Sequence, residues 1–113
     1  MRYMDTVKRV RDALKPFVEK GIPVNHGASK GKDYPKIIWM HGPEETGLHK
    51  DNRKIAQTVT GEVYYFTRQE YDPIVDEIQE ALNGITGLGW RLSEVEVSED
   101  GVWFYSWDWE AVS

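Results

Sequence analysis

Cysteine is absent from the sequence, so a disulfide framework, a thiol nucleophile and a cysteine-ligated zinc site are all excluded. Long hydrophobic runs are also missing: residues 37–40 form one of the longest, far below the length of a membrane span. The first residues lack the basic and then apolar pattern of a secretory signal. We therefore expect no membrane partner.

What the sequence has in excess is acidic charge in one half. Residues 1–54 contain 12 Lys and Arg against 7 Asp and Glu, whereas residues 55–113 contain 2 against 12. This asymmetry indicates either two complementary surfaces or two halves that interleave in the fold and average out. A length of 113 residues suits one domain, which we assign to residues 1–113.

Two helices are predicted. The first covers about the first twenty residues, kinks or ends near Pro16 and is stopped by Gly21. The second is capped by Asp72, with Pro73 at its first position, and ends at Asn83 and Gly84. Their apolar stripes are Met4, Val7, Val10, Leu14, Phe17 and Val18 in the first, and Ile74, Ile78, Leu82 and Ile85 in the second.

Strand patterns occupy much of the remaining chain. A short extended piece at residues 22–24 precedes strands at 36–41 and 57–68, and a closing hairpin joins residues 90–97 and 102–111 through an Asp-Gly turn. A change of apolar parity between Leu92 and Val95 predicts a bulge. Residues 42–54 are predicted as a long polar loop. The fold class is α+β: two helices packed on a mainly antiparallel sheet, in the order α-β-β-β-α-β-β.

The last strand places four large aromatic side chains on one face: Trp103, Tyr105, Trp107 and Trp109. A stacking platform for nucleic-acid bases normally lies in a basic groove, and this half of the chain is acidic. We therefore favour a core face on which the helices pack. A subunit contact through Trp107 or Trp109 at the end of the strand stays open, because interfaces favour aromatic residues.

Motifs for catalysis or metal binding are weak. The three histidines, His26, His41 and His49, lack a ligand at helical spacing, and no nucleophile elbow is present. Ser29 next to Lys30 lies in a glycine-rich polar stretch, which gives no buried lysine for a dyad. The acidic pairs are predicted on loops or polar helix faces, which lack the hydrophobic pocket or close partner that a catalytic carboxylate needs. We predict no enzyme activity, no cofactor and no metal.

The order of the segments resembles one family. They are LKPFVEKGIPV, YPKIIWMHG, DNRKIAQTVTGEVYYFTRQEYD, PIVDEIQEALN and GWRLSEVEVSEDGVWFYSWDWE. Together they are similar to the small tail-terminator, or head–tail joining, proteins of long-tailed bacteriophages, over nearly the whole chain. The most telling part is a strand ending in an aromatic and a Thr, followed by charged residues and a helix that begins Asp-Pro.

The resemblance implies a structural virion protein of the tail and neck, present in the host cytoplasm during assembly. It implies a homo-oligomeric ring, usually of six copies, that caps the tail tube, docks onto the head connector or stopper protein, and lets genomic DNA pass without sequence-specific binding. By position, residues 27–33 and 42–53 would form contacts. The candidate interface residues are Lys30, Lys32, Asp33, Glu44, Glu45, His49, Lys50, Asp51, Arg53, Trp107 and Trp109.

Two alternatives remain at this point. The first is a small regulator or inhibitor that binds one protein partner, which would share the lack of catalytic residues. The second is a single-stranded nucleic-acid-binding domain that uses the aromatic strand, whose affinity would depend on salt and on Trp107.

Overall fold

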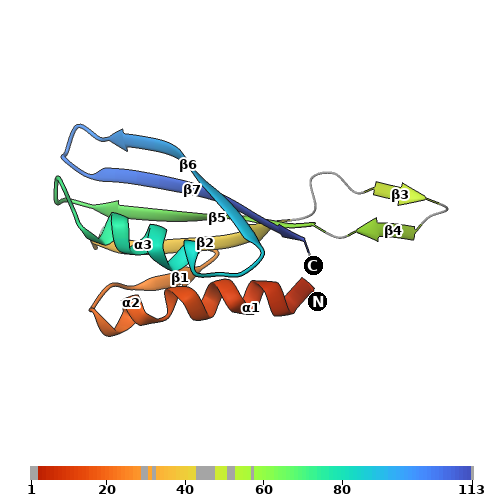
Figure 1. Cartoon of the computed structure of the whole chain (residues 1–113). Helices are drawn as coiled ribbons and strands as arrows, with labels where there is room; N and C mark the ends of the chain where they lie inside the picture. The colour runs from red at the N-terminus through yellow and green to blue at the C-terminus, as the bar shows by residue number, and fades with distance from the viewer. Residues whose placement is uncertain are drawn as a thin grey trace.

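The structure is a computed structural model of the chain and describes residues 3–28, 31, 33–42, 48–50, 53–56 and 58–112. Two layers make up the described body: a five-stranded sheet and a layer of helices on one of its faces (Figure 1). The α+β class is confirmed. None of the described helices is long and apolar enough to cross a bilayer.

The sheet has the order β1-β2-β5-β7-β6. Strand β1 (Val24–His26) runs parallel to β2 (Lys36–Gly42), and the other pairs are antiparallel. The long central strand β5 (Thr58–Thr67) lies between β2 and β7 (Trp103–Val112), and β6 (Leu88–Val97) forms the far edge. The sheet is therefore mainly antiparallel, with one parallel pair at its β1 edge.

A correction concerns the stretch predicted as a polar loop. Residues 48–50 and 53–56 form two strands, β3 (Leu48–Lys50) and β4 (Arg53–Ala56), which pair antiparallel in a sheet of their own. A further short helix also precedes β1. The observed order is thus α1-α2-β1-β2-β3-β4-β5-α3-β6-β7. Leu48 is the one aliphatic residue among residues 42–54, so this stretch lacks the alternation of apolar residues that predicts a strand.

The helices begin and end close to where the sequence predicts. Helix α1 (Tyr3–Leu14) is followed by the single turn α2 (Pro16–Glu19), because Pro16 has no N–H to continue the helix. Helix α3 (Ile74–Asn83) starts just after Asp72, whose carboxylate accepts a hydrogen bond of 2.9 Å from the Ile74 N–H. Asp72 therefore satisfies an otherwise unpaired donor at the helix start.

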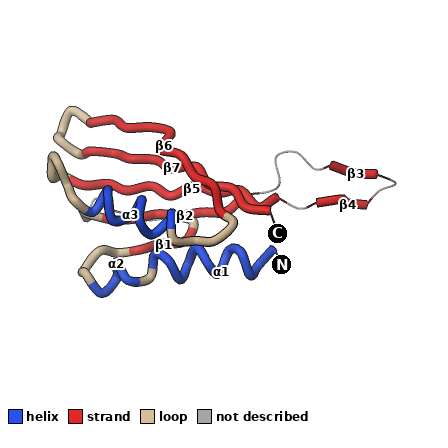
Figure 2. Tube along the Cα trace, in the orientation of Figure 1, coloured by secondary structure: helices blue, strands red, loops and turns tan. Residues whose placement is uncertain are grey.

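The core lies between the helices and the sheet, as the two layers in Figure 2 show. Its largest fully buried side chains include Trp107, Tyr65, Leu14 and Ile37. Alternate residues of β5, from Val59 to Tyr65, point into this core, while Tyr64 and Phe66 point to the opposite face. The predicted bulge is present in β6, where the pairing with β7 shifts between Leu92 and Glu94.

Candidate protein interfaces

No described element covers the sheet face opposite the helices, and this face is partly apolar. Three aromatic rings pack together on it: Phe104 lies 5.0 Å from Phe66 and 5.6 Å from Tyr64, between ring centroids. Ile38 and Met40 of β2 join them along a shallow hollow of about 730 Å³. We call these five residues the open sheet face. All five side chains are half-buried, so they offer apolar surface to a partner.

Acidic groups border the open sheet face. Glu62, Glu94 and Asp108 line the same hollow. Arg91 of β6 forms an exposed ion pair with Asp108, with 3.3 Å between Nη2 and Oδ2. Lys36 is buried instead: its Nζ donates to the Gly31 carbonyl oxygen at 2.8 Å and lies over the Phe66 ring. The rim of this face is thus predominantly negative.

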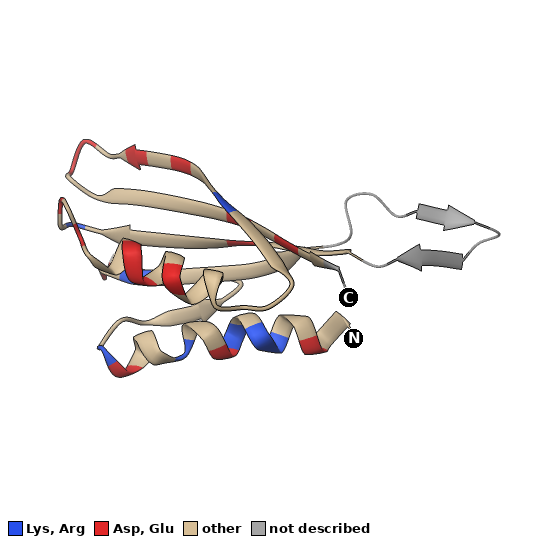
Figure 3. Ribbon diagram, in the orientation of Figure 1, with Lys and Arg blue, Asp and Glu red and all other residues tan. Residues whose placement is uncertain are grey.

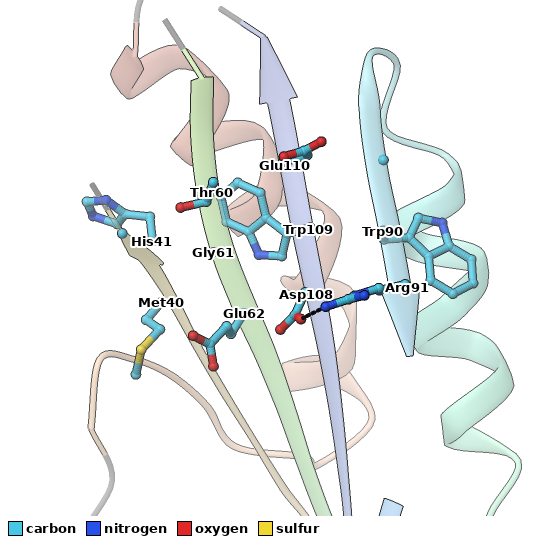
Figure 4. Close-up of a pocket in the computed structure, with 12 residues that line it drawn as sticks. Met40, His41, Thr60, Gly61, Glu62, Trp90, Arg91, Asp108, Trp109 and Glu110 are labelled. Atoms are coloured by element: carbon cyan, nitrogen blue, oxygen red, sulfur yellow. Dashed lines mark hydrogen bonds and ion pairs between the residues drawn. The ribbon is translucent and has the colours of Figure 1, made fainter. Parts of the chain in front are cut away.

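A second hollow, of about 580 Å³, lies across the ends of β2, β5, β7 and β6 (Figure 4). The Trp109 indole lies across Gly61 in its wall and is 2% exposed. Among the residues that the structure describes, its Nε1 has no acceptor. The hollow combines this indole with carboxylates from β5 and β7, those of Glu62, Asp108 and Glu110.

Histidine and tyrosine join the start of α1 to the end of β2. The Tyr3 hydroxyl lies 2.9 Å from His41 Nδ1 and donates to the Gly42 carbonyl oxygen at 2.7 Å. His26 stacks on Trp39 with 3.9 Å between ring centroids, and partial burial, together with the nearby His41, lowers the His26 pKa. Within the described part of the chain, no three His, Asp or Glu residues cluster as a metal site would require.

Charge is separated across the molecule. Helix α1 has three basic residues, Lys8, Arg9 and Arg11, beside the acidic Asp5 and Asp12, while Figure 3 shows acidic residues on α3, on β6 and at the turn between β6 and β7. Helix α1 and strand β6 lie on opposite sides of the described body (Figure 1). The uneven charge seen along the sequence therefore does not average out over these elements.

The predicted contact residues have different outcomes. Asp33 is exposed, while Lys30, Lys32, Glu44, Glu45 and Asp51 lie outside the described residues, and His49, Lys50 and Arg53 are described in their backbone alone, on β3 and β4. The surface contact considered for Trp107 and Trp109 is corrected: both are core residues, 0% and 2% exposed. Helix packing buries them, which also removes Trp107 as a base-stacking platform.

Sequence reasoning missed the exposed apolar residues of β6. Leu92, Val95 and Val97 are 42%, 47% and 54% exposed. Their alternation predicts a half-buried strand, yet in the structure only Leu88 and Trp90, in the first half of β6, pack against the core. The parity change at the bulge was the available signal, since it turns Val95 and Val97 to the helix side beside Tyr105 and Trp103.

No protein-family model matches this sequence, and no curated protein matches it significantly. The family resemblance therefore depends on the order and content of the segments themselves.

Proposed function

We propose that this protein is a ring-forming structural component of a bacteriophage virion, the tail terminator at the head-proximal end of a long tail. In this role copies assemble into a ring, cap the tail tube and dock onto the head connector or stopper protein. The support is the resemblance of the segments to that family, together with an α+β fold of two longer helices on a mainly antiparallel sheet.

The observation that carries the proposal is the separation of charge between α1 and the β6–β7 side of the molecule (Figure 3). A closed ring uses head-to-tail contacts, in which two different surfaces of each copy complement each other. Opposite charge on opposite sides provides such a pair. A monomeric binding protein would not need both surfaces.

The acidic rim of the open sheet face suits a channel through which DNA moves. Carboxylates such as Glu62, Glu94 and Asp108 repel phosphates, so DNA would slide past them without being held. We propose that this rim faces the channel. A map of the assembled ring with lysine and arginine side chains lining the channel would contradict this part of the proposal.

The test is assembly on tail tubes. The purified 13.1 kDa chain is incubated with polymerised tail tube protein and imaged by negative-stain electron microscopy, with light scattering to give the mass of any free ring. We expect a ring at one end of each tube and an end to further tube growth. A chain that forms no ring and caps no tube would overturn the proposal.

A second function, a regulator that binds a single protein partner, is favoured by the open sheet face alone. Its half-buried Tyr64, Phe66 and Phe104 offer an apolar surface of the kind that protein partners cover. The tube experiment separates the two, since a regulator stays a 13.1 kDa species in the presence of tubes.

A further inference from the structure

One exposed stripe runs along α1 and α2. Met4, Lys8, Arg11, Lys15 and Val18 follow one another at intervals of four, three, four and three residues, which places them on one side of a helix. All five are exposed, Met4 by 52% and Val18 by 54%. We call them the α1 stripe. It presents three basic side chains between two apolar ends.

A complementary surface lies on the second half of β6. Leu92, Val95 and Val97 are the exposed apolar residues of this strand, and we call them the β6 patch. Val95 pairs with Tyr105 and Val97 with Trp103, so the patch faces the helix side of the sheet. Leu88 and Trp90, in the first half of the strand, pack against the core, whereas the patch in its second half is left exposed.

The two surfaces match in length. The α1 stripe spans about 21 Å at the rise of a helix. The β6 patch spans about 16 Å at the rise of a strand. One helix therefore covers the whole patch when it lies along the strand.

They also match in charge. Between residues 70 and 101 the chain has nine acidic residues, and Arg91 is its one basic residue. Asp76 and Glu80 lie exposed on α3, and Glu99 lies exposed at the turn that follows the patch. A helix with three basic side chains placed there meets acidic groups on two sides, while its apolar ends meet apolar surface.

We propose that the α1 stripe of one copy docks on the β6 patch of the next copy, continuing the helix layer of that neighbour. The inference rests on the proposed ring and names its subunit contact. Because α1 and β6 lie on opposite sides of one copy, the contact is head-to-tail and repeats around a ring. A second copy is the occupant because the chain itself carries both matching surfaces.

The first test uses the absence of cysteine, which makes two introduced thiols the only ones present. The double variant Arg11→Cys with Val95→Cys is assembled on tail tubes and oxidised. We expect a ladder of disulfide-linked multimers on a non-reducing gel. The control pairs Arg11→Cys with Glu110→Cys, because Glu110 is exposed on the opposite face of the sheet, and we expect no ladder from it.

The second test compares two identical charge reversals. Arg11 and Arg91 each form an exposed ion pair, with Asp12 and Asp108 respectively, so the same change to Glu disturbs a similar local contact. Arg11→Glu places acid against acid in the proposed contact and weakens ring assembly about tenfold or more. Arg91→Glu, on the other sheet face, leaves assembly within about twofold of the unchanged chain.

The outcomes separate this inference from the proposed function. Rings that form normally with Arg11→Glu, or that cross-link in the control pair instead of the Arg11–Val95 pair, overturn the contact and leave the ring intact. An unchanged chain that never assembles overturns both. Circular dichroism and thermal melting of each variant check folding, which these exposed positions leave unaffected.

Discussion

At the scale of single residues, Gly61 of β5 leaves the space that the indole of Trp109, on β7, occupies. A Cβ added at this position would collide with the indole of Trp109 and with the backbone oxygen of Met40. Neither obstacle moves easily, because the indole is buried and the oxygen belongs to the neighbouring strand. The absence of a side chain at Gly61 is therefore what lets the large indole lie flat against the sheet.

We predict that Gly61→Ala lowers the free energy of unfolding by about 2 kcal/mol or more, since the added methyl group overpacks the core. The matched control is Gly89→Ala in β6, where an added Cβ meets nothing closer than a backbone oxygen at 4.0 Å. That change should stay within about 0.5 kcal/mol. Urea denaturation measures both, and equal effects would contradict this account of the Trp109 contact.

Tyr65 is the most shifted titratable residue described. Burial raises the pKa of its phenol above the usual value near 10, and the hydrogen bond to Asp72 raises it further. The hydroxyl donates to Asp72 Oδ2 over 2.5 Å, and the side chain is fully buried. The folded state thus keeps Tyr65 protonated at a pH where the unfolded chain loses the proton.

The consequence for stability has a definite sign. Below pH 10 the contribution of Tyr65 is complete, and it declines as the pH rises above 10, because the unfolded chain then ionises and the folded chain does not. Tyr65→Phe should flatten this alkaline decline. Tyr71→Phe, which alters a ring 88% exposed, should keep it. Urea midpoints measured between about pH 9 and pH 11 provide the comparison; a decline unchanged in Tyr65→Phe would rule out Tyr65 as its source.

At the scale of elements, α3 is attached to the sheet by the carboxylate of Asp72. This buried group accepts hydrogen bonds from the hydroxyls of Tyr65 and Thr67 on β5 and from the backbone of Ile74 in the helix. One side chain therefore links the end of a strand to the start of a helix. It also fixes the orientation of the tight connection between them.

We predict that Asp72→Ala destabilises the fold by about 3 kcal/mol, because the cap is lost and two buried hydroxyls lose an acceptor. Asp76→Ala, in the first turn of the same helix but exposed, removes only a favourable charge near the helix start. It should cost about 0.5 kcal/mol. Chemical denaturation of the two variants measures the difference. Similar losses of unfolding free energy would show that the hydrogen bonds of Asp72 do not hold α3 to the sheet.

Elements with a local signal could be predicted from the sequence. The Asp-Pro start of α3, the break at Pro16 and the alternation of β5 each depend on neighbours in the chain, and all are confirmed. The bulge near Leu92 could be predicted too, because parity is a local property. These features need no knowledge of what packs on them.

What depends on distant partners could not be predicted. The parallel pairing of β1 with β2 and the hairpin β3–β4 have no local mark. Trp107 and the exposed Val97 belong to similar strand patterns, yet one is fully buried and the other 54% exposed. The position of α3 over the sheet makes this difference, and a single strand does not encode it. The candidate contact surfaces therefore emerged only in three dimensions.

At the scale of the whole molecule, the opposed charges of α1 and the β6–β7 side give the proposed ring a dependence on ionic strength. Raising the salt from about 0.05 M to about 0.5 M shortens the screening length and should shift rings toward single copies. Light scattering measures the shift. The Arg11→Glu chain, which already lacks the attraction, should respond less, and an assembly insensitive to salt would indicate a purely apolar contact.

The start of α1 and the end of β7 lie at the same end of the molecule, and the turn between β6 and β7 lies at the other (Figure 1). Joining the two termini by a short linker and opening the chain between Glu99 and Asp100, in an exposed turn, would move both ends across the molecule. A gold label on the original chain and one on this circular permutant would then mark opposite rims of an assembly. Comparing the two images would give the polarity of each copy along the tail axis.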